Sequence, residues 1–535
     1  MIILASNNLK MNLSRTIIGV SLIALMSCKN ASPTFNVNNG LLVENVTVIS
    51  ANKNGIIDKY IGHVLLDNEK ILYSGIQKPS VTGTIKNING EGKFIIPGLI
   101  DSHVHLANVA GMTWQNQRDH PELAKSYFNQ LPKSYLYYGY TTLIDVNNYA
   151  PDIVENIKNH VIRPDIYTCG QQVQVMDDFM MEMEELPLKD RLEYPFLFDK
   201  YNEDIHIPDS IHLELHSPRA IVSAIVREQQ GIGVKIVYED ESSGFPQSWE
   251  LPSLHLMRDL IAQAHKEGIP VLMHATSYDA QKFGLEAGID IFAHSMWNWY
   301  KNPEQFLDTE FTKEHQDVLK EIATRKNGYQ LTFRTIYGEV DLFDNNFNAD
   351  PALVDIYPEA YLNWLNTEEG NWGKQKIIHR AKVIKAINPT LFNFLRAQFE
   401  SDEAMFRGIQ EVFIQRMNTV AKYLADNDAN LLFGTDGVAM NMSTNPPGYN
   451  GFLEMQHWLN AGVSLEKIFL AATYNNANAF HIGDNYGTIE KGKIANLLLL
   501  DQDPLQNIAA YDQINSVIIR GENHPRNTLS ASQNH

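Results

Sequence analysis

His103 and His105, separated by one residue, are the first side chains along the chain that could together bind a metal ion. They end an apolar run that begins at Gly98. In a β-strand, side chains two positions apart point to the same face, so both imidazoles could contact one cation. Alone such a pair is weak evidence, because many histidines lie on surfaces or in cores without binding a metal.

Four further ionisable residues lie in or at the ends of apolar runs, namely Lys235, His274, His294 and Asp436. Two of them also have an ordinary interpretation. Lys235 could be a surface lysine with an extended side chain, and Asp436 could be a turn residue in Thr-Asp-Gly. These four residues and the histidine pair predict one cluster only if the fold brings the ends of their strands together.

Eight apolar, β-rich runs end in polar or ionisable residues and alternate with helical stretches, which indicates an α/β fold with parallel strands. Eight such strands predict a (β/α)₈ TIM barrel, where catalytic groups lie at the C-terminal ends of the strands. Five of the candidate residues lie at or near such ends. The eight runs are Gly98–His105, Thr141–Asp145, Asp165–Cys169, Gly233–Tyr238, Ile269–His274, Asp290–His294, Tyr329–Arg334 and Asn430–Asp436.

The segment Pro97–Leu106, with the sequence PGLIDSHVHL, resembles the first-strand signature of the amidohydrolase superfamily. The segments around His274, His294 and Asp436 are similar to its fifth-, sixth- and eighth-strand motifs, in the expected order. Residues 487–497 resemble its terminal β-sandwich signature. Within the superfamily, the chain looks most similar to the imidazolonepropionase-like and prolidase-like group.

This resemblance implies a centre of two divalent metal ions, with Zn²⁺ the best match to the ligand types. His103, His105 and Asp436 would hold one ion, and His274 and His294 the other. Lys235 would bridge them after carboxylation by CO₂, because two cations would repel a free ammonium. Asp436 would also be the catalytic residue, moving a proton from the attacking water to the leaving group.

The expected reaction is hydrolysis of a C–N bond in an amide, dipeptide or cyclic amide by metal-activated hydroxide. The same scaffold could instead hydrolyse a lactone, an ester or a phosphotriester, or the protein could be a non-catalytic binding lipoprotein. Tyr238 and Arg334 are candidates for substrate contacts, although each could equally be packed or solvated. The substrate does not follow from the sequence, and neither does the oligomeric state, for which a homo-oligomer is one option.

The charge balance restricts the partners. Lys+Arg 43 against Asp+Glu 63 gives a net charge of −20, and no basic cluster offsets it. Such a chain repels phosphate backbones, so a small molecule or short peptide is the expected partner and nucleic acid is not.

Residues 1–28 predict a lipoprotein signal peptide. The apolar run Thr16–Met26 is too short to cross a bilayer, and Leu25–Cys28 resembles the bacterial lipoprotein processing box. Cys28 would carry the lipid, which would be the only membrane attachment and would place the protein on the periplasmic face of a bacterial membrane. An ordinary cleaved signal peptide would instead leave a soluble periplasmic protein.

The sequence pattern divides the remaining chain into a tether and two domains. Residues 29–37 predict a tether, 38–96 and 485–535 predict two parts of one small β-sandwich, and 97–484 predict the barrel. Two stretches, Gln171–Pro218 and Ile336–Glu400, are too long for simple connections and predict lids over the barrel mouth.

Overall fold

The computed structural model describes residues 32–179, 196–202, 212–244, 249–343, 347–438 and 441–533. The predicted signal peptide with Cys28 lies outside these ranges, as do residues 29–31 of the predicted tether. In the part of the chain described, no helix is both long and apolar enough to cross a bilayer.

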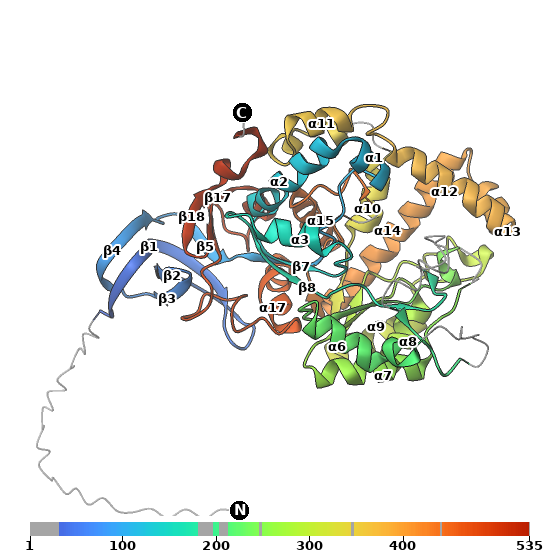
Figure 1. Ribbon diagram of the computed structural model, residues 1–535, viewed down its shortest axis with the longest axis horizontal. Coiled ribbons are helices and arrows are strands. Elements are labelled where there is room, and N and C mark those ends of the chain that lie inside the picture. The colour runs from blue at the N-terminus through green and yellow to red at the C-terminus, as the bar shows by residue number, and fades with distance from the viewer. Residues whose placement is uncertain are drawn as a thin grey trace, which may run out of the picture.

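Both ends of the chain contribute strands to one sheet. Its order is β18-β17-β16-β5-β1-β2-β3, with β4 also paired to β1. Figure 1 shows these N-terminal strands in blue and C-terminal strands in red together at one side of the molecule. The strands are β1 (Thr34–Ala51), β2 (Ile57–Asp67), β3 (Lys70–Gly75), β4 (Ser80–Asn89), β5 (Phe94–Pro97), β16 (Leu497–Leu500), β17 (Ile514–Ile519) and β18 (Glu522–Pro525).

One boundary in this domain was predicted wrongly. Residues 34–37 of the predicted tether form the start of β1, where Val37 is buried and pairs with Gly83 of β4. The sheet bends at an irregularity between Val43 and Val46, where Asn45 has a positive φ of 54°. Valine side chains on both sides of the bend are fully buried, and this apolar face stabilises the domain.

All eight expected parallel strands are present. They form two hydrogen-bonded groups, β6-β7-β8 and β11-β12-β13-β14-β15. Backbone hydrogen bonds also link the groups to each other at both edges, from His105 N to Gly437 O (2.7 Å) and from Ile232 N to Thr168 O (2.8 Å). The strands are β6 (Leu99–Val104), β7 (Tyr140–Asp145), β8 (Asp165–Thr168), β11 (Val234–Val237), β12 (Val271–His274), β13 (Ile291–Ala293), β14 (Gly328–Gln330) and β15 (Asn430–Leu432).

Helices follow most of these strands, and local sequence explains where they begin. Ser253 caps α7 by accepting a hydrogen bond from Leu256 N, and Ser277 caps α8 in the same way. The buried residues of α7 recur every three or four positions, as in an amphipathic helix with one buried face. These helices are α1 (Trp114–Asp119), α2 (Pro121–Tyr137), α3 (Pro151–Lys158), α6 (Pro218–Arg227), α7 (Leu254–Lys266), α8 (Tyr278–Ala287), α9 (Lys313–Arg325), α14 (Asp402–Asp426), α15 (Tyr449–Asn460), α16 (Leu465–Leu470) and α17 (Asn476–Ala479).

The two long insertions differ. The first lies partly outside the described residues, and its described part includes the paired short strands β9 (Gln174–Val175) and β10 (Phe196–Leu197). The second is mostly helical and connects β14 to α14. Its helices are α10 (Arg334–Asp341), α11 (Glu359–Leu365), α12 (Gly373–Ile387) and α13 (Pro389–Arg396).

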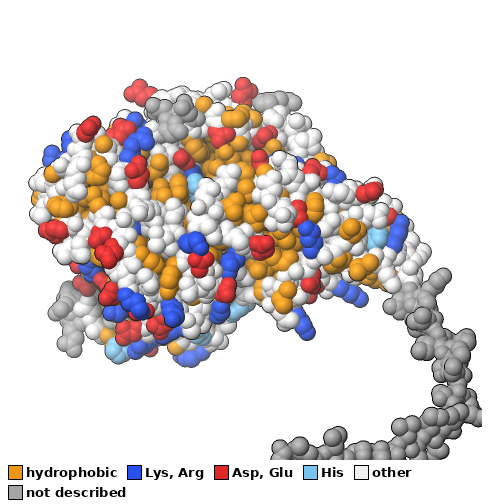
Figure 2. Space-filling view, turned by 180° about the vertical axis from the view of Figure 1, so that it is seen from behind, with side chains coloured by type: hydrophobic (Ala, Val, Ile, Leu, Met, Phe, Trp, Pro, Cys, Tyr) orange, Lys and Arg blue, Asp and Glu red, His pale blue; other side chains and the backbone are white. Residues whose placement is uncertain are grey.

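On the surface, charges of both signs are mixed. The face in Figure 2 carries Lys and Arg side chains interspersed with Asp and Glu, and hydrophobic side chains lie between them.

Candidate metal centre

Five of the six predicted ligands lie at or near the C-terminal ends of the parallel strands. His103 and His105 are at the end of β6, and His274 is the last residue of β12. His294 and Asp436 come shortly after β13 and β15, and Lys235 lies within β11. The alternation of inward and outward side chains in a strand accounts for their common direction.

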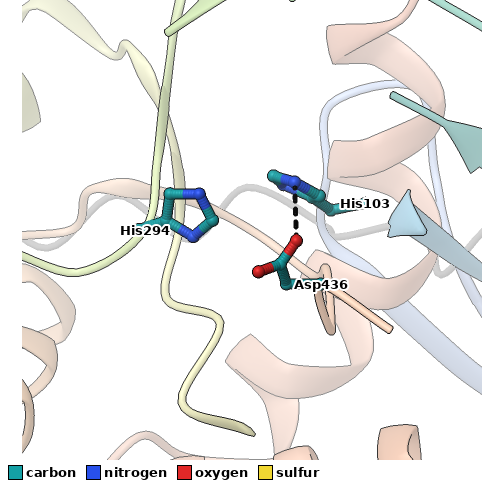
Figure 3. Close-up of side chains that lie close together, drawn as sticks. All are labelled: His103, His294 and Asp436. Carbon is teal, nitrogen blue, oxygen red and sulfur yellow. Dashed lines mark ion pairs between the residues drawn. The ribbon is translucent and has the colours of Figure 1, made fainter. Parts of the chain in front are cut away.

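Asp436 lies at the centre of the cluster. Its Oδ1 is 3.2 Å from His103 Nε2 and 2.9 Å from His105 Nε2. The ring centre of His294 is 5.1 Å from that of His103 and 4.4 Å from that of His274. Figure 3 shows His103 and His294 on either side of Asp436, with the ion pair between His103 and Asp436 dashed.

Three of these residues can contribute ligands to a single ion. One ligand atom from each of His103, His294 and Asp436 lies within 4.8 Å of the others, and all three side chains are buried. Buried imidazoles beside a carboxylate are the ligand types that Zn²⁺ and related divalent ions prefer.

The backbone around the cluster adopts conformations that non-glycine residues rarely occupy. φ is 75° at His294 and 55° at Asp436, and it is 45° at Thr332, whose side chain contacts His294. Such conformations persist only where surrounding structure enforces them, and they concentrate at functional sites.

Gln330 determines which nitrogen of His103 faces the cluster. Its Nε2 donates to Ser102 Oγ (2.8 Å) and Ser102 O (3.1 Å), which leaves Oε1 to accept from His103 Nδ1 (2.8 Å). In a neutral imidazole, Nε2 of His103 then carries a lone pair directed at Asp436. A lone pair and a carboxylate oxygen repel each other unless a cation or a proton lies between them, so this arrangement fits a metal ion.

The buried surroundings of the ligands also favour the protonation states that bind a metal ion. Burial, together with the nearby Lys235, lowers the pKa of His103 to about 4 and that of His294 well below its usual range. Burial opposes the charge of Asp436, but the histidines around it outweigh burial and hold its pKa well below the usual range. Neutral imidazoles and an ionised carboxylate are the forms that bind metal.

Lys235 is 2% exposed, and its Nζ has no hydrogen-bond partner among the described residues. Burial lowers its pKa to about 8. An unpartnered buried ammonium is costly, whereas a carbamate formed from the amine and CO₂ would be an anion stabilised by the metal ions that it would bind. The surroundings of Lys235 therefore fit a group that bridges two metal ions.

One residue of the site, Glu239, was missed from the sequence. Its Oε2 lies 2.7 Å from His274 Nε2 and accepts a hydrogen bond from Thr276 Oγ1 (3.1 Å). Glu239 is buried and follows β11 by two positions, and an acidic residue just beyond a strand end was the available signal. The contact orients the imidazole of His274.

The structure does not bring Tyr238 and Arg334 to the site. Tyr238 packs against Phe283 of α8, with ring centres 4.5 Å apart. Arg334 is 1% exposed and donates to Asn450 Oδ1, Asp341 Oδ2 and Thr444 O. It was expected at a strand end, but β14 stops at Gln330 and Arg334 begins α10, so its guanidinium has a structural role.

A cavity of about 280 Å³ adjoins the cluster. Asp436, His274 and Glu239 line it, and Thr335 Oγ1 donates to Asp436 Oδ2 (3.3 Å). Leu391 of α13, from the second insertion, also contributes to the wall. The second insertion therefore borders the site.

The sequence profile of the amidohydrolase family matches residues 94–298 and 405–523. No curated protein matches the chain.

Many solved structures resemble it. A Xaa-Pro dipeptidase with bound methionine is 18% identical, with 91% of this chain and 100% of that one covered and a TM-score of 0.56. The ochratoxinase of A. niger is 14% identical, with 91% and 96% covered and a TM-score of 0.59. Phenylurea hydrolase B is 18% identical, with 91% and 97% covered and a TM-score of 0.55. At these identities the likeness shows a shared fold.

Proposed function

Because the chain belongs to the amidohydrolase family and is therefore a hydrolase, we propose that it uses bound metal to cleave a C–N bond of an amide, dipeptide or cyclic amide. The observation that carries this proposal is the approach of two imidazole Nε2 atoms, of His103 and His105, to one oxygen of Asp436. The names of two proteins of similar fold, a Xaa-Pro dipeptidase and a phenylurea hydrolase, indicate that they cleave C–N bonds, which supports this bond type.

The proposed scaffold is a closed (β/α)₈ barrel, with the sheet from both chain ends as a β-sandwich. The hydrogen bonds that link β15 to β6 and β8 to β11 support closure of the barrel. The proposed cofactor is a pair of Zn²⁺ ions, with His103, His105 and Asp436 holding one and His274 and His294 the other. Lys235, carboxylated at Nζ, would bridge them.

The bound ions would supply Lewis acidity, which activates water as a nucleophile and polarises a carbonyl group. The protein's own residues contribute the rest. Asp436, whose Oδ2 accepts a hydrogen bond from Thr335 Oγ1, would accept a proton from water and deliver it to the leaving nitrogen. Glu239 orients His274, and Gln330 orients His103. The apolar wall of the cavity excludes bulk water, which strengthens electrostatic interactions inside.

Hydrolysis by the zinc-loaded protein of matched amide, lactone and phosphotriester substrates tests the proposal. We expect the amide to be cleaved, the activity to be lost with a chelator, and Asp436→Asn to lower kcat by several orders of magnitude while retaining the fold. Preference for the lactone or the phosphotriester would refute the bond type. Full activity of the Asp436→Asn protein would refute the role of Asp436.

We also propose that Cys28 carries a lipid that anchors the protein at the periplasmic face of a bacterial membrane. The support is the sequence of residues 16–28, with its short apolar run ending in Leu-Met-Ser-Cys.

A further inference from the structure

The cavity beside the metal centre is largely apolar. Phe306, Leu391, Phe392, Leu395, Phe406 and Ile409 all line it and belong to one buried cluster, built mainly from α13 and α14. These residues lie far along the chain from most of the ligands, so the wall is a separate feature from the catalytic cluster. Apolar walls of this kind bind apolar groups by excluding water.

The charged residues of the cavity all have one sign. Among the described residues that line it, none is Lys or Arg, and three are acidic: Glu239, Glu339 and Asp436. Glu239 and Asp436 contact histidines of the metal centre. Glu339 is buried on α10, where its Oε2 accepts a hydrogen bond from Gln410 Nε2 (3.0 Å). A substrate carboxylate held at the apolar wall, away from the metal ions, would thus be desolvated near Glu339, and no Lys or Arg among the described lining residues would pair with it.

We propose that the substrate is a neutral amide whose larger substituent, an aryl or alkyl group, occupies the apolar wall, and that carboxylate-bearing substrates such as dipeptides are disfavoured. This inference rests on the proposed hydrolytic function and specifies its substrate. The volume of about 280 Å³ is close to the lower limit of small-molecule sites, about 300 Å³, so the cavity accommodates one such substituent.

The test compares two series of substrates with the zinc-loaded protein. In the first, 4-nitroanilides carry acetyl, butyryl and hexanoyl groups. We expect kcat/KM to rise about fourfold per added methylene, which corresponds to about 0.8 kcal/mol for each buried CH₂. In the second, N-hexanoyl-phenylalaninamide is compared with N-hexanoyl-phenylalanine, and the neutral compound is expected to be favoured by at least tenfold. A flat first series, or equal or better cleavage of the carboxylate, would overturn the inference.

A pair of variants on α12 tests the effect of adding a cationic side chain to the cavity wall. Ile384 lines the cavity and is half-buried, whereas Ile387 is 43% exposed and does not line it. Ile384→Arg should shift the preference toward the carboxylate by at least tenfold, and Ile387→Arg should leave it unchanged. An unchanged preference in a folded Ile384→Arg protein, or an equal shift in both variants, would contradict the inference.

The experiments distinguish a failure of the proposed hydrolytic function from a failure of this inference. If the zinc-loaded protein cleaves no amide of either series, hydrolysis of these bonds is refuted. Calorimetric binding of the two uncleaved phenylalanine compounds then decides the inference, since tighter binding of the neutral compound supports it and tighter binding of the carboxylate overturns it.

Discussion

Replacement of Gln330 by leucine should weaken metal binding without a direct change to any ligand. Gln330 is 0% exposed, and it accepts from His103 Nδ1 and donates to Ser102. Leucine has a similar size but cannot form these hydrogen bonds, so Nδ1 of His103 loses its acceptor. Loss of such support typically lowers metal affinity about 10- to 100-fold, which is about 1.4 to 2.7 kcal/mol.

The same substitution should also destabilise the metal-free protein. Three buried groups, His103 Nδ1, Ser102 O and Ser102 Oγ, each lose a hydrogen bond to Gln330, although Ser102 Oγ still donates to Phe433 O. A buried polar group left without a partner costs about 1 to 3 kcal/mol. Gln281 provides a matched control, because it is also 0% exposed and donates to Ala275 O and Tyr329 OH, neither of which is a ligand. We therefore expect similar losses of stability in Gln330→Leu and Gln281→Leu, but a loss of metal affinity only in Gln330→Leu.

Chelator competition gives the zinc affinity of each protein, and denaturant unfolding with and without zinc gives the stabilisation by the metal. At the same excess of zinc, the metal should stabilise Gln330→Leu less than the wild type by about 1.4 to 2.7 kcal/mol. Gln330→Glu, which retains an acceptor for His103, should recover most of the affinity. The reasoning is refuted if Gln330→Leu binds zinc as the wild type does, or if Gln281→Leu loses as much affinity.

Three further predictions follow from other residues. Lys235→Ala should lose bound metal, and added short carboxylic acids should restore part of it; elemental analysis showing unchanged metal content would remove the bridging role. Arg416 is 1% exposed and donates to the carbonyl groups of Trp297, Phe306 and Asp308. The substitution Arg416→Met should therefore lower the free energy of unfolding by about 3 to 5 kcal/mol, whereas Arg118→Met, at an exposed position, should lower it by less than about 0.5 kcal/mol. Mass spectrometry of membrane-extracted protein should find acyl chains on Cys28, and a mature chain that begins at another residue without lipid would contradict the anchor.

The strands could be predicted because each is a short apolar run that ends in polar residues, a local pattern that the buried strands require. His274, for example, is both the end of its run and the end of β12. The convergence of the candidate ligands followed from the rule that parallel strands present their C-terminal ends on one side.

What could not be predicted depends on contacts between distant parts of the chain. Arg334 continues an apparently β-rich run, but Thr332 has a positive φ of 45° that turns the chain into α10, and no local signal marks this turn. Tyr238 was expected at the site, but Phe283 of another element determines its position. The pairing of Glu239 with His274 and the apolar wall from α13 and α14 depend on packing in the same way.

The pairing of β5 with β16 has a consequence for biosynthesis. Roughly 400 residues separate these neighbours, so at about 5 to 20 residues per second the ribosome needs some 20 to 80 s to make the second strand after the first. During that interval the edge of β5 lacks its partner, and β5 leads directly into the strand with His103. The nascent chain should therefore depend on chaperones until its last strands emerge, and deletions near the C-terminus should cause aggregation rather than a simple loss of turnover.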